Sequence, residues 1–159
     1  MSSVVKDSYR KWVMDHQFDG LSVTLTSKQN VGGLKLDHLS LQRNVRYFKN
    51  ILNRKVFGNS YFRYGKELKT LFIQEKGEDI RYHIHGVIEY PRHFDLKDFE
   101  EMIRDSWSRT LFGYDQIHIE DPSNQLRKEG WVNYIMKNKT KSDFSLSIDL
   151  ENSSCFHLC

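Results

Sequence analysis

Alternating apolar and polar residues predict strands in four short segments of the chain. They are LSVTLT (21–26), KTLFIQE (69–75), RYHIHGVIEY (81–90) and YDQIHIED (114–121). In the first segment Leu21, Val23 and Leu25 fall on one face, because successive side chains of a strand point to opposite sides. The second and third segments are separated by the polar turn KGED, so we expect them to pair as an antiparallel hairpin. The glycine-containing stretch VGGLKL is expected only to end the first strand.

Helical spacing of apolar residues predicts three helices among these strands. They are expected from Asp37 to about Asn53, from Asp95 to about Thr110, and from Ser123 or Asn124 to about Lys139. The core face of the first helix is predicted to contain Leu39, Leu41, Val45, Phe48 and Leu52. The aromatic segment NSYFRYG (59–65) is predicted as a short strand or a sheet edge. This order of elements favours an α+β fold, in which a central antiparallel sheet of about five strands carries flanking helices.

Composition favours one folded domain. The chain has 159 residues, 38% of them hydrophobic and 13% aromatic, which is enough for one core without disulfides. We expect an N-terminal segment over residues 1–18, the domain over 19–141 and a polar C-terminal tail over 142–159. Cys155 and Cys159 lie close together in the tail, so they predict no disulfide framework and a reducing compartment.

The charge of the chain is mildly basic, with a net charge of +3 and a pI of about 8.8. Such a balance permits a polyanionic partner without requiring one. The first residues contain no apolar stretch typical of a signal peptide, and no segment has the length of a membrane span. The sequence therefore predicts a soluble, intracellular protein.

Two histidines and a glutamate are candidate metal ligands. His83 and His85 lie two residues apart in a predicted strand, so both imidazoles point to one face. If the hairpin folds about Asp79, Glu75 lies directly opposite His83 and joins the histidines on that face. A slip of one residue would present Gln74 instead, and an amide is a poorer ligand for a divalent cation than a carboxylate.

One carboxylate and two imidazoles suit Mn²⁺, Zn²⁺ or Co²⁺ and, more weakly, Mg²⁺. Three protein ligands leave coordination positions open, as catalysis requires. The alternative is that the histidines only decorate a solvent-exposed face, since His-x-His is common in strands. His118, in the fourth predicted strand, is assigned no role.

Tyr134 and Lys137 form a second candidate pair. They are three residues apart in WVNYIMKNKTK, on the last predicted helix, so they share one face. A tyrosine hydroxyl becomes an effective nucleophile when a cation is nearby or when its electrophile is strongly polarised. The simpler interpretation is an amphipathic tyrosine beside a solvated basic face.

Together these motifs resemble the HUH endonuclease superfamily. LSVTLT is similar to its first motif, HIHG preceded by EKGED to its second, and YIMK to its third. The tyrosine follows the histidine pair and has no second tyrosine within a helical turn. This arrangement resembles the single-tyrosine replication initiators (Rep) of rolling-circle plasmids and small single-stranded DNA viruses. The resemblance covers about residues 20–140.

The resemblance implies an RRM-like antiparallel sheet with flanking helices, the HUH nuclease fold. It also implies a sequence-specific endonuclease that nicks and rejoins single-stranded DNA at a replication origin. Glu75, His83 and His85 would bind Mg²⁺ or Mn²⁺, and Tyr134 would attack the scissile phosphate to give a 5′-phosphotyrosine and a free 3′-OH. Lys137 would neutralise charge in the transition state or help to position water at the ion.

Residues expected to contact the DNA are Thr24, Thr26, Arg46, Lys49, Arg63 and Lys139. The two threonines point away from the apolar face of the first strand, toward the expected ion. The basic residues lie on predicted helices or among aromatic side chains. Cations follow phosphates and rings stack on bases in single-stranded nucleic acid. Each basic residue also has a simpler role as ordinary surface cover.

Three alternatives stay open. An HUH-type single-strand DNA transposase would share the motifs, an origin-binding module would bind without cleavage, and a metal-dependent hydrolase would leave Tyr134 idle. The sequence contains no GxxxxGK[ST] ATPase motif. A Rep protein would therefore need a helicase supplied in trans or by a missing C-terminal domain. Its compartment would be a bacterial cytoplasm or a host nucleus, depending on the genetic element.

Overall fold

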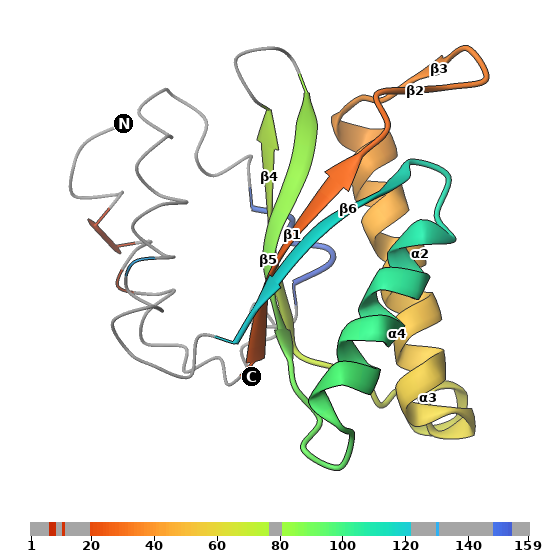
Figure 1. Ribbon diagram of the computed structural model, residues 1–159, viewed down its shortest axis with the longest axis vertical. Helices are drawn as coiled ribbons and strands as arrows, with labels where there is room; N and C mark the ends of the chain where they lie inside the picture. The colour runs from red at the N-terminus through yellow and green to blue at the C-terminus, as the bar shows by residue number, and fades with distance from the viewer. Residues whose placement is uncertain are drawn as a thin grey trace.

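The central sheet is antiparallel and carries helices on one side (Figure 1). The structure, a computed structural model, describes residues 7–8, 11, 20–76, 81–121, 130 and 148–153. The main sheet has the strand order β4-β5-β1-β6, formed by β1 (Gly20–Ser27), β4 (Thr70–Lys76), β5 (Tyr82–Glu89) and β6 (Gly113–Glu120). The helices α2 (His38–Phe57) and α4 (Leu96–Ser108) cover one face. The α+β class is thus confirmed, with four strands in the main sheet among the described residues, and the predicted count of about five is not confirmed.

Alternation along the strands divides this sheet into two different faces. Leu21, Val23 and Leu25 of β1 are buried, as predicted, and form one core with Ile84 and Ile88 of β5. The buried apolar residues of α2 and α4 belong to the same core. The residues between these positions therefore face the opposite side of the sheet.

The helix α2 begins where the sequence predicts. The carboxylate of Asp37 accepts a hydrogen bond from the backbone N–H of Ser40 at 2.7 Å, which caps the first turn. The helix continues past the predicted end at Asn53 to Phe57. It stops at Gly58, whose φ of 54° is not helical.

One predicted core residue of α2 is exposed. Leu41, Val45, Phe48 and Leu52 are buried as expected, but Leu39 is 59% exposed. Leu39 lies two residues before Leu41 and so points about 200° around the helix from it. The inclusion of Leu39 in the core was therefore wrong.

The helix α4 also begins as predicted, with the Asp95 carboxylate accepting a hydrogen bond from the backbone N–H of Lys97 at 2.9 Å. Its buried residues include Phe99, Ile103 and Trp107. The Trp107 ring meets the Phe48 ring edge-on, with centroids 5.5 Å apart. This contact joins the two helices within the core.

The segment predicted as a strand at residues 59–65 is instead a short helix, α3 (Asn59–Tyr64). Gly58 and Gly65 have positive φ angles of 54° and 61°, and they bound this helix of six residues on both sides. The Tyr61 hydroxyl donates a hydrogen bond to Asn50 Oδ1 at 2.7 Å. The glycines and this bond to α2 override the strand preference of the aromatic residues.

A small hairpin was also missed in the sequence. The strands β2 (Asn30–Val31) and β3 (Leu34–Lys35) pair across Gly32 and Gly33, whose φ angles are 57° and 83°. Two adjacent positive φ angles are typical of the tight turns that join such strands. The Gly-Gly pair within VGGLKL was the pattern that could have indicated it.

Residues 148–153, expected to belong to a polar tail, lie against the outer edge of β4. The backbone N–H of Asp149 donates to the Phe72 carbonyl at 2.9 Å, and the backbone N–H of Phe72 donates to the Ser153 hydroxyl at 3.0 Å. Asp149, Asn152 and Ser153 are buried there. Because an edge strand leaves backbone groups unpaired, this segment supplies hydrogen-bond partners for the outer edge of β4 at Phe72. The boundary of the tail at residue 142 stays a prediction.

None of the described helices combines the length and the apolar composition that a membrane span requires.

Candidate metal centre

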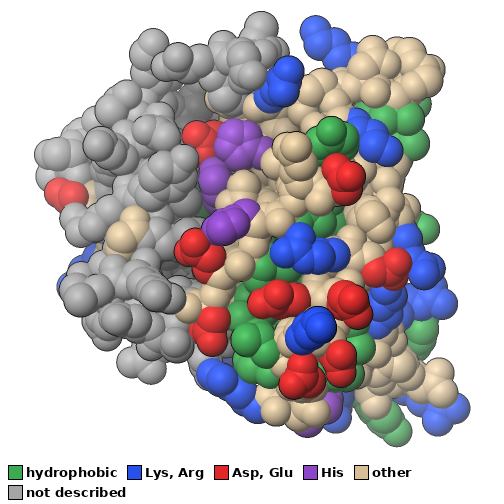
Figure 2. All heavy atoms as spheres, in the orientation of Figure 1, with side chains coloured by type: hydrophobic (Ala, Val, Ile, Leu, Met, Phe, Trp, Pro, Cys, Tyr) green, Lys and Arg blue, Asp and Glu red, His purple; other side chains and the backbone are tan. Residues whose placement is uncertain are grey.

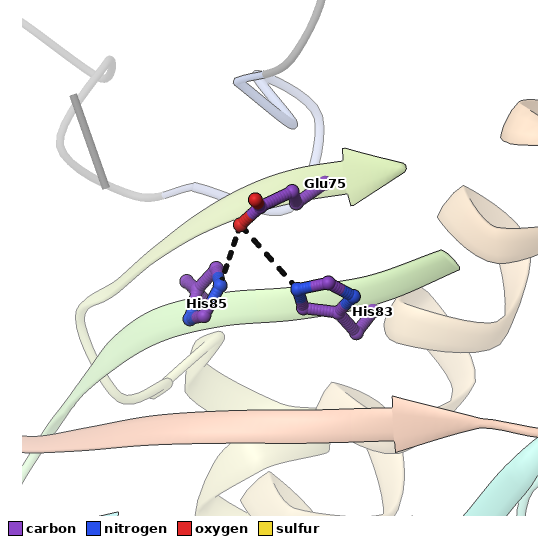
Figure 3. Close-up of side chains that lie close together, drawn as sticks. All are labelled: Glu75, His83 and His85. Carbon is purple, nitrogen blue, oxygen red and sulfur yellow. Dashed lines mark ion pairs between the residues drawn. The ribbon is translucent and has the colours of Figure 1, made fainter. Parts of the chain in front are cut away.

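The pairing of β4 with β5 brings three metal-ligand side chains together. Glu75 lies directly opposite His83, in the register that the sequence predicts. The side chains of Glu75, His83 and His85 converge above the sheet (Figure 3). Gln74 pairs with Ile84 and so belongs to the helical face. The predicted register is confirmed, and the slipped alternative is excluded.

Short distances join the three side chains. Glu75 Oε2 is 2.7 Å from His85 Nε2 and 3.4 Å from His83 Nε2. One ligand atom from each residue lies within 4.8 Å of the other two. The side chain of His85 is 6% exposed, that of Glu75 16% and that of His83 26%. The cluster is therefore half-buried and is most accessible on the side of His83.

The imidazoles keep the carboxylate ionised. Hydrogen bonds from His83 and then from His85 hold the pKa of Glu75 well below its usual range, against the opposing effect of burial. A cation bound at the two Nε2 atoms would take the place of these hydrogen bonds, and each neutral imidazole would then carry its proton on Nδ1. Glu75 would need no deprotonation, because its carboxylate is already charged.

Threonines of β1 flank the histidines on the same face. Thr26 pairs with His83 and Thr24 pairs with His85. The Thr24 hydroxyl lies 3.2 Å from His85 Nδ1. A hydroxyl can donate or accept, so this contact holds the ring with Nε2 toward Glu75 in either tautomer. Both threonines were predicted beside the ligands, and the structure places them there.

The donor set fits a divalent cation. Among the described residues, Glu75, His83 and His85 offer two imidazole nitrogens and one carboxylate oxygen within reach of a single ion. Mixed nitrogen and oxygen ligands suit Mn²⁺ and Zn²⁺, and suit Mg²⁺ less. Because only three ligands come from this cluster, coordination positions stay open for a substrate or water.

His118 extends the polar surface across the sheet. It pairs with Thr24 from the β6 side, just as His85 does from the β5 side. Its Nε2 lies 2.8 Å from Glu120 Oε1. Figure 2 shows histidine side chains (purple) along this part of the sheet, with acidic side chains (red) beside them. The sequence assigned His118 no role, because the pairing of β6 with β1 cannot be read from local patterns.

Three of the basic residues predicted to contact DNA lie away from the cluster. Arg46 of α2 forms an ion pair with Glu151 at 2.9 Å, and the largely buried Lys49 has its Nζ 4.0 Å from Glu67. Arg63 is exposed on α3. Since α2 packs on the face opposite the metal-ligand cluster, the structure does not bring these residues together with it.

Tyr134, Lys137 and Lys139 lie outside the described residues, as does the helix predicted to carry them. Their positions relative to the metal ligands stay predictions.

Comparisons with protein-family models, with curated proteins and with solved structures found no match to this chain. The case for a function therefore depends on the geometry of the cluster and on the sequence motifs.

Proposed function

We propose that this chain is a metal-dependent endonuclease of the HUH Rep type, which nicks single-stranded DNA through a covalent tyrosine intermediate. The observation that carries the proposal is the convergence of Glu75, His83 and His85 on one face of an antiparallel sheet. The YIMK motif supplies Tyr134 as the nucleophile and Lys137 as its basic neighbour. The resemblance implies an antiparallel sheet with flanking helices, and the four-stranded sheet with α2 and α4 on one face supports this arrangement.

Glu75, His83 and His85 would hold Mg²⁺ or Mn²⁺. When bound, the ion would polarise the scissile phosphate and offset the charge that develops on it. Thr24 would keep the His85 ring oriented through its contact with Nδ1.

The covalent step would exchange one phosphoester bond for another. Tyr134 Oη attacks the phosphorus and loses its proton, and a bond between the tyrosine and the 5′-phosphate forms. The bond to the 3′ oxygen breaks, and this oxygen takes up a proton to become a free 3′-OH. Lys137 would stabilise the negative charge on the phosphoryl oxygens. Because the reaction conserves the number of ester bonds, attack by a new 3′-OH reverses it and rejoins the strand.

This chemistry would initiate rolling-circle replication, in which the free 3′-OH primes synthesis. The partners would be single-stranded DNA at an origin and a helicase, supplied in trans or by a further C-terminal domain. The same chemistry in an HUH-type transposase would join element ends instead.

The proposal is tested by trapping the covalent intermediate. The chain is incubated with a pool of single-stranded oligonucleotides and Mn²⁺, and the products are separated on a denaturing gel. We expect a protein band shifted by covalently bound DNA. This band should be lost with EDTA and in Tyr134→Phe. Tyr47→Phe removes the same hydroxyl from an exposed tyrosine of α2 and should retain the band.

Other results point to the alternatives. Cleavage without a covalent band would exclude Tyr134 as the nucleophile and favour a metal-dependent hydrolase. Tight binding without cleavage would favour an origin-binding module. Joining of two element-end hairpins would favour a transposase.

A further inference from the structure

A groove beside the metal-ligand cluster opens at the end of the sheet that carries the β2–β3 hairpin. Thr26 and His83 are among the residues that line it, so it is continuous with the cluster. Its volume is about 750 Å³, within the range of ~300–1,000 Å³ that is typical of ligand pockets. The groove therefore has room for a short segment of a longer ligand next to the cluster.

The groove is basic. Lys28, Lys35 and Arg81 line it with exposed side chains, and its described lining includes no aspartate or glutamate. Within the part of the chain that the structure describes, no carboxylate forms an ion pair with Lys28 or Lys35. Cations gathered in a concave surface attract a polyanion.

Aromatic rings lie among these cations. Tyr82 and Tyr114 line the groove, and Tyr114 is 42% exposed. Lys76 Nζ lies 5.4 Å from the centroid of the Tyr82 ring, which adds a further cation beside it. Rings interleaved with cations bind single-stranded nucleic acid, because phosphates follow the charges and bases stack on the rings.

A side-chain amide holds the groove in shape. Gln29 Oε1 accepts a hydrogen bond from the backbone N–H of Tyr82 at 2.8 Å, and Gln29 Nε2 donates to the Tyr82 carbonyl at 3.2 Å. Gln29 Nε2 also donates to the Ser27 carbonyl at 2.7 Å. These bonds join the segment that carries Lys28 to the start of β5, one residue before His83. The spacing between the basic residues and the metal ligands is thereby set by the fold.

We infer that this groove binds the nucleotides next to the scissile phosphate of single-stranded DNA. Lys28, Lys35 and Arg81 contact phosphates, and Tyr82 and Tyr114 contact bases. The inference rests on the proposed function and deepens it, since it gives the substrate strand a path to the metal ligands. It moves the main DNA contacts from the basic residues of α2 and α3 to the loops at this end of the sheet.

The test measures binding of labelled single-stranded oligonucleotides in EDTA, where cleavage does not contribute, over a range of salt concentrations. The groove variant is Lys28→Gln/Lys35→Gln/Arg81→Gln, and the control variant is Lys69→Gln/Arg92→Gln/Lys97→Gln. Both remove three positive charges from exposed positions. Lys69 and Arg92 lie near the other end of β5, where the Lys69 carbonyl accepts from the backbone N–H of Glu89, and Lys97 lies in the first turn of α4.

The two triple variants should differ in affinity and in salt dependence. Loss of three phosphate contacts should make the slope of log K against log salt shallower by about 2 and weaken binding for all sequences. The affinity of the groove variant should fall at least tenfold at low salt, while the control keeps the parental slope. Melting curves by circular dichroism should show that both variants are folded.

A second variant tests the aromatic contacts separately. Tyr114→Ala should lower the affinity severalfold without changing the salt slope, because stacking involves no release of counterions. Equal losses in the two triple variants would overturn the inference, and so would the absence of any DNA binding by the parent.

The proposed function can fail separately from the inference. Groove-dependent binding without a covalent adduct would reject the nuclease and retain the groove as a DNA site. An adduct that forms equally well in the groove variant would reject the groove and retain the nuclease.

Discussion

The two faces of the sheet are built from the same strands and have opposite chemistry. In β5, Ile84 and Ile88 pack into the core under the helices, while His83 and His85 at the intervening positions converge with Glu75. Because side chains alternate along a strand, one segment of eight residues contributes to both a hydrophobic core and a candidate metal centre. The packed face holds the backbone from which the ligands extend.

Two partly or largely buried carboxylates near β4, Glu75 and Asp149, have pKa values that are shifted in opposite directions. Glu75 accepts hydrogen bonds from imidazoles, which lower its pKa. Asp149, at the edge of β4, accepts from the neutral amides of Asn152 and Gln42, and burial raises its pKa. Burial beside neutral amides thus goes with a raised carboxyl pKa, and burial beside two imidazoles goes with a lowered one.

The largest loss of stability is expected from a substitution on the sheet face that α2 and α4 cover. Trp107 is fully buried, and its Nε1–H donates to the Thr26 carbonyl at 2.7 Å. Trp107→Ala should lower the free energy of unfolding by about 3–5 kcal/mol, because it leaves a cavity and an unpaired carbonyl. Denaturant unfolding followed by circular dichroism measures the loss. The control Leu111→Ala, at a side chain that is 52% exposed, should change it by less than about 0.5 kcal/mol.

On the opposite face, loss of a ligand should remove metal binding while the fold is retained. Glu75→Gln keeps the shape of the side chain but removes its charge, so Mn²⁺ affinity should fall at least about 100-fold. Isothermal titration calorimetry measures the affinity. Glu120→Gln is the matched control, because its carboxylate lies beside His118 on the same face but outside the cluster. Unchanged affinity in Glu75→Gln would exclude the cluster as the metal centre.

Gly86 of the HIHG motif belongs to the helical face, although it follows a ligand directly. A Cβ there would lie 2.6 Å from Phe72 Cδ1 and 2.9 Å from the Leu71 carbonyl oxygen. Gly86→Ala should therefore lower the free energy of unfolding by about 1–3 kcal/mol. Phe72→Leu in the same chain should recover part of the loss in a double-mutant cycle. Strictly additive losses would show that the clash with the ring is not the cause.

The lowered pKa of Glu75 predicts an acid dependence of stability in metal-free protein. The folded pKa lies below the unfolded value near 4.5, so the contribution is fully present above that value and is lost as pH falls through the folded pKa. The free energy of unfolding of the metal-free parent protein should exceed that of the Glu75→Gln variant by about 1 kcal/mol near neutral pH. This difference should narrow below about pH 4.5. A difference that widens toward acid would contradict the assigned direction.

The smallest effect on stability is expected at Leu39, which the sequence-based prediction wrongly assigned to the core. Leu39 has a side chain that is 59% exposed, so Leu39→Ala should change the free energy of unfolding by less than about 0.5 kcal/mol. Leu41→Ala, on the buried stripe of the same helix, should lower it by about 2–5 kcal/mol. Equal losses at the two positions, measured by denaturant unfolding, would restore Leu39 to the core.

The parts of the fold that follow from local rules could be predicted. Asp37 and Asp95 mark the starts of α2 and α4 because a carboxylate at that position caps the first turn. The register that joins Glu75 to His83 could be derived because a tight hairpin leaves few alternatives. The short helix α3 could not, since strand propensity is a weak preference that glycines and packing override.

The sequence by itself determined the four strands of the main sheet, the starts of α2 and α4 and the three candidate metal ligands, because periodicity, capping and hairpin register act over a few neighbouring residues. Only the tertiary structure decided that His118 shares the ligand face, that α2 holds Arg46 and Lys49 away from it, and that a basic groove adjoins His83. The reason is physical: these relations depend on which distant strands pair and which face the helices cover. The pairing of distant strands and the packing of helices on one face produce no periodic pattern of apolar residues within a single segment of the sequence.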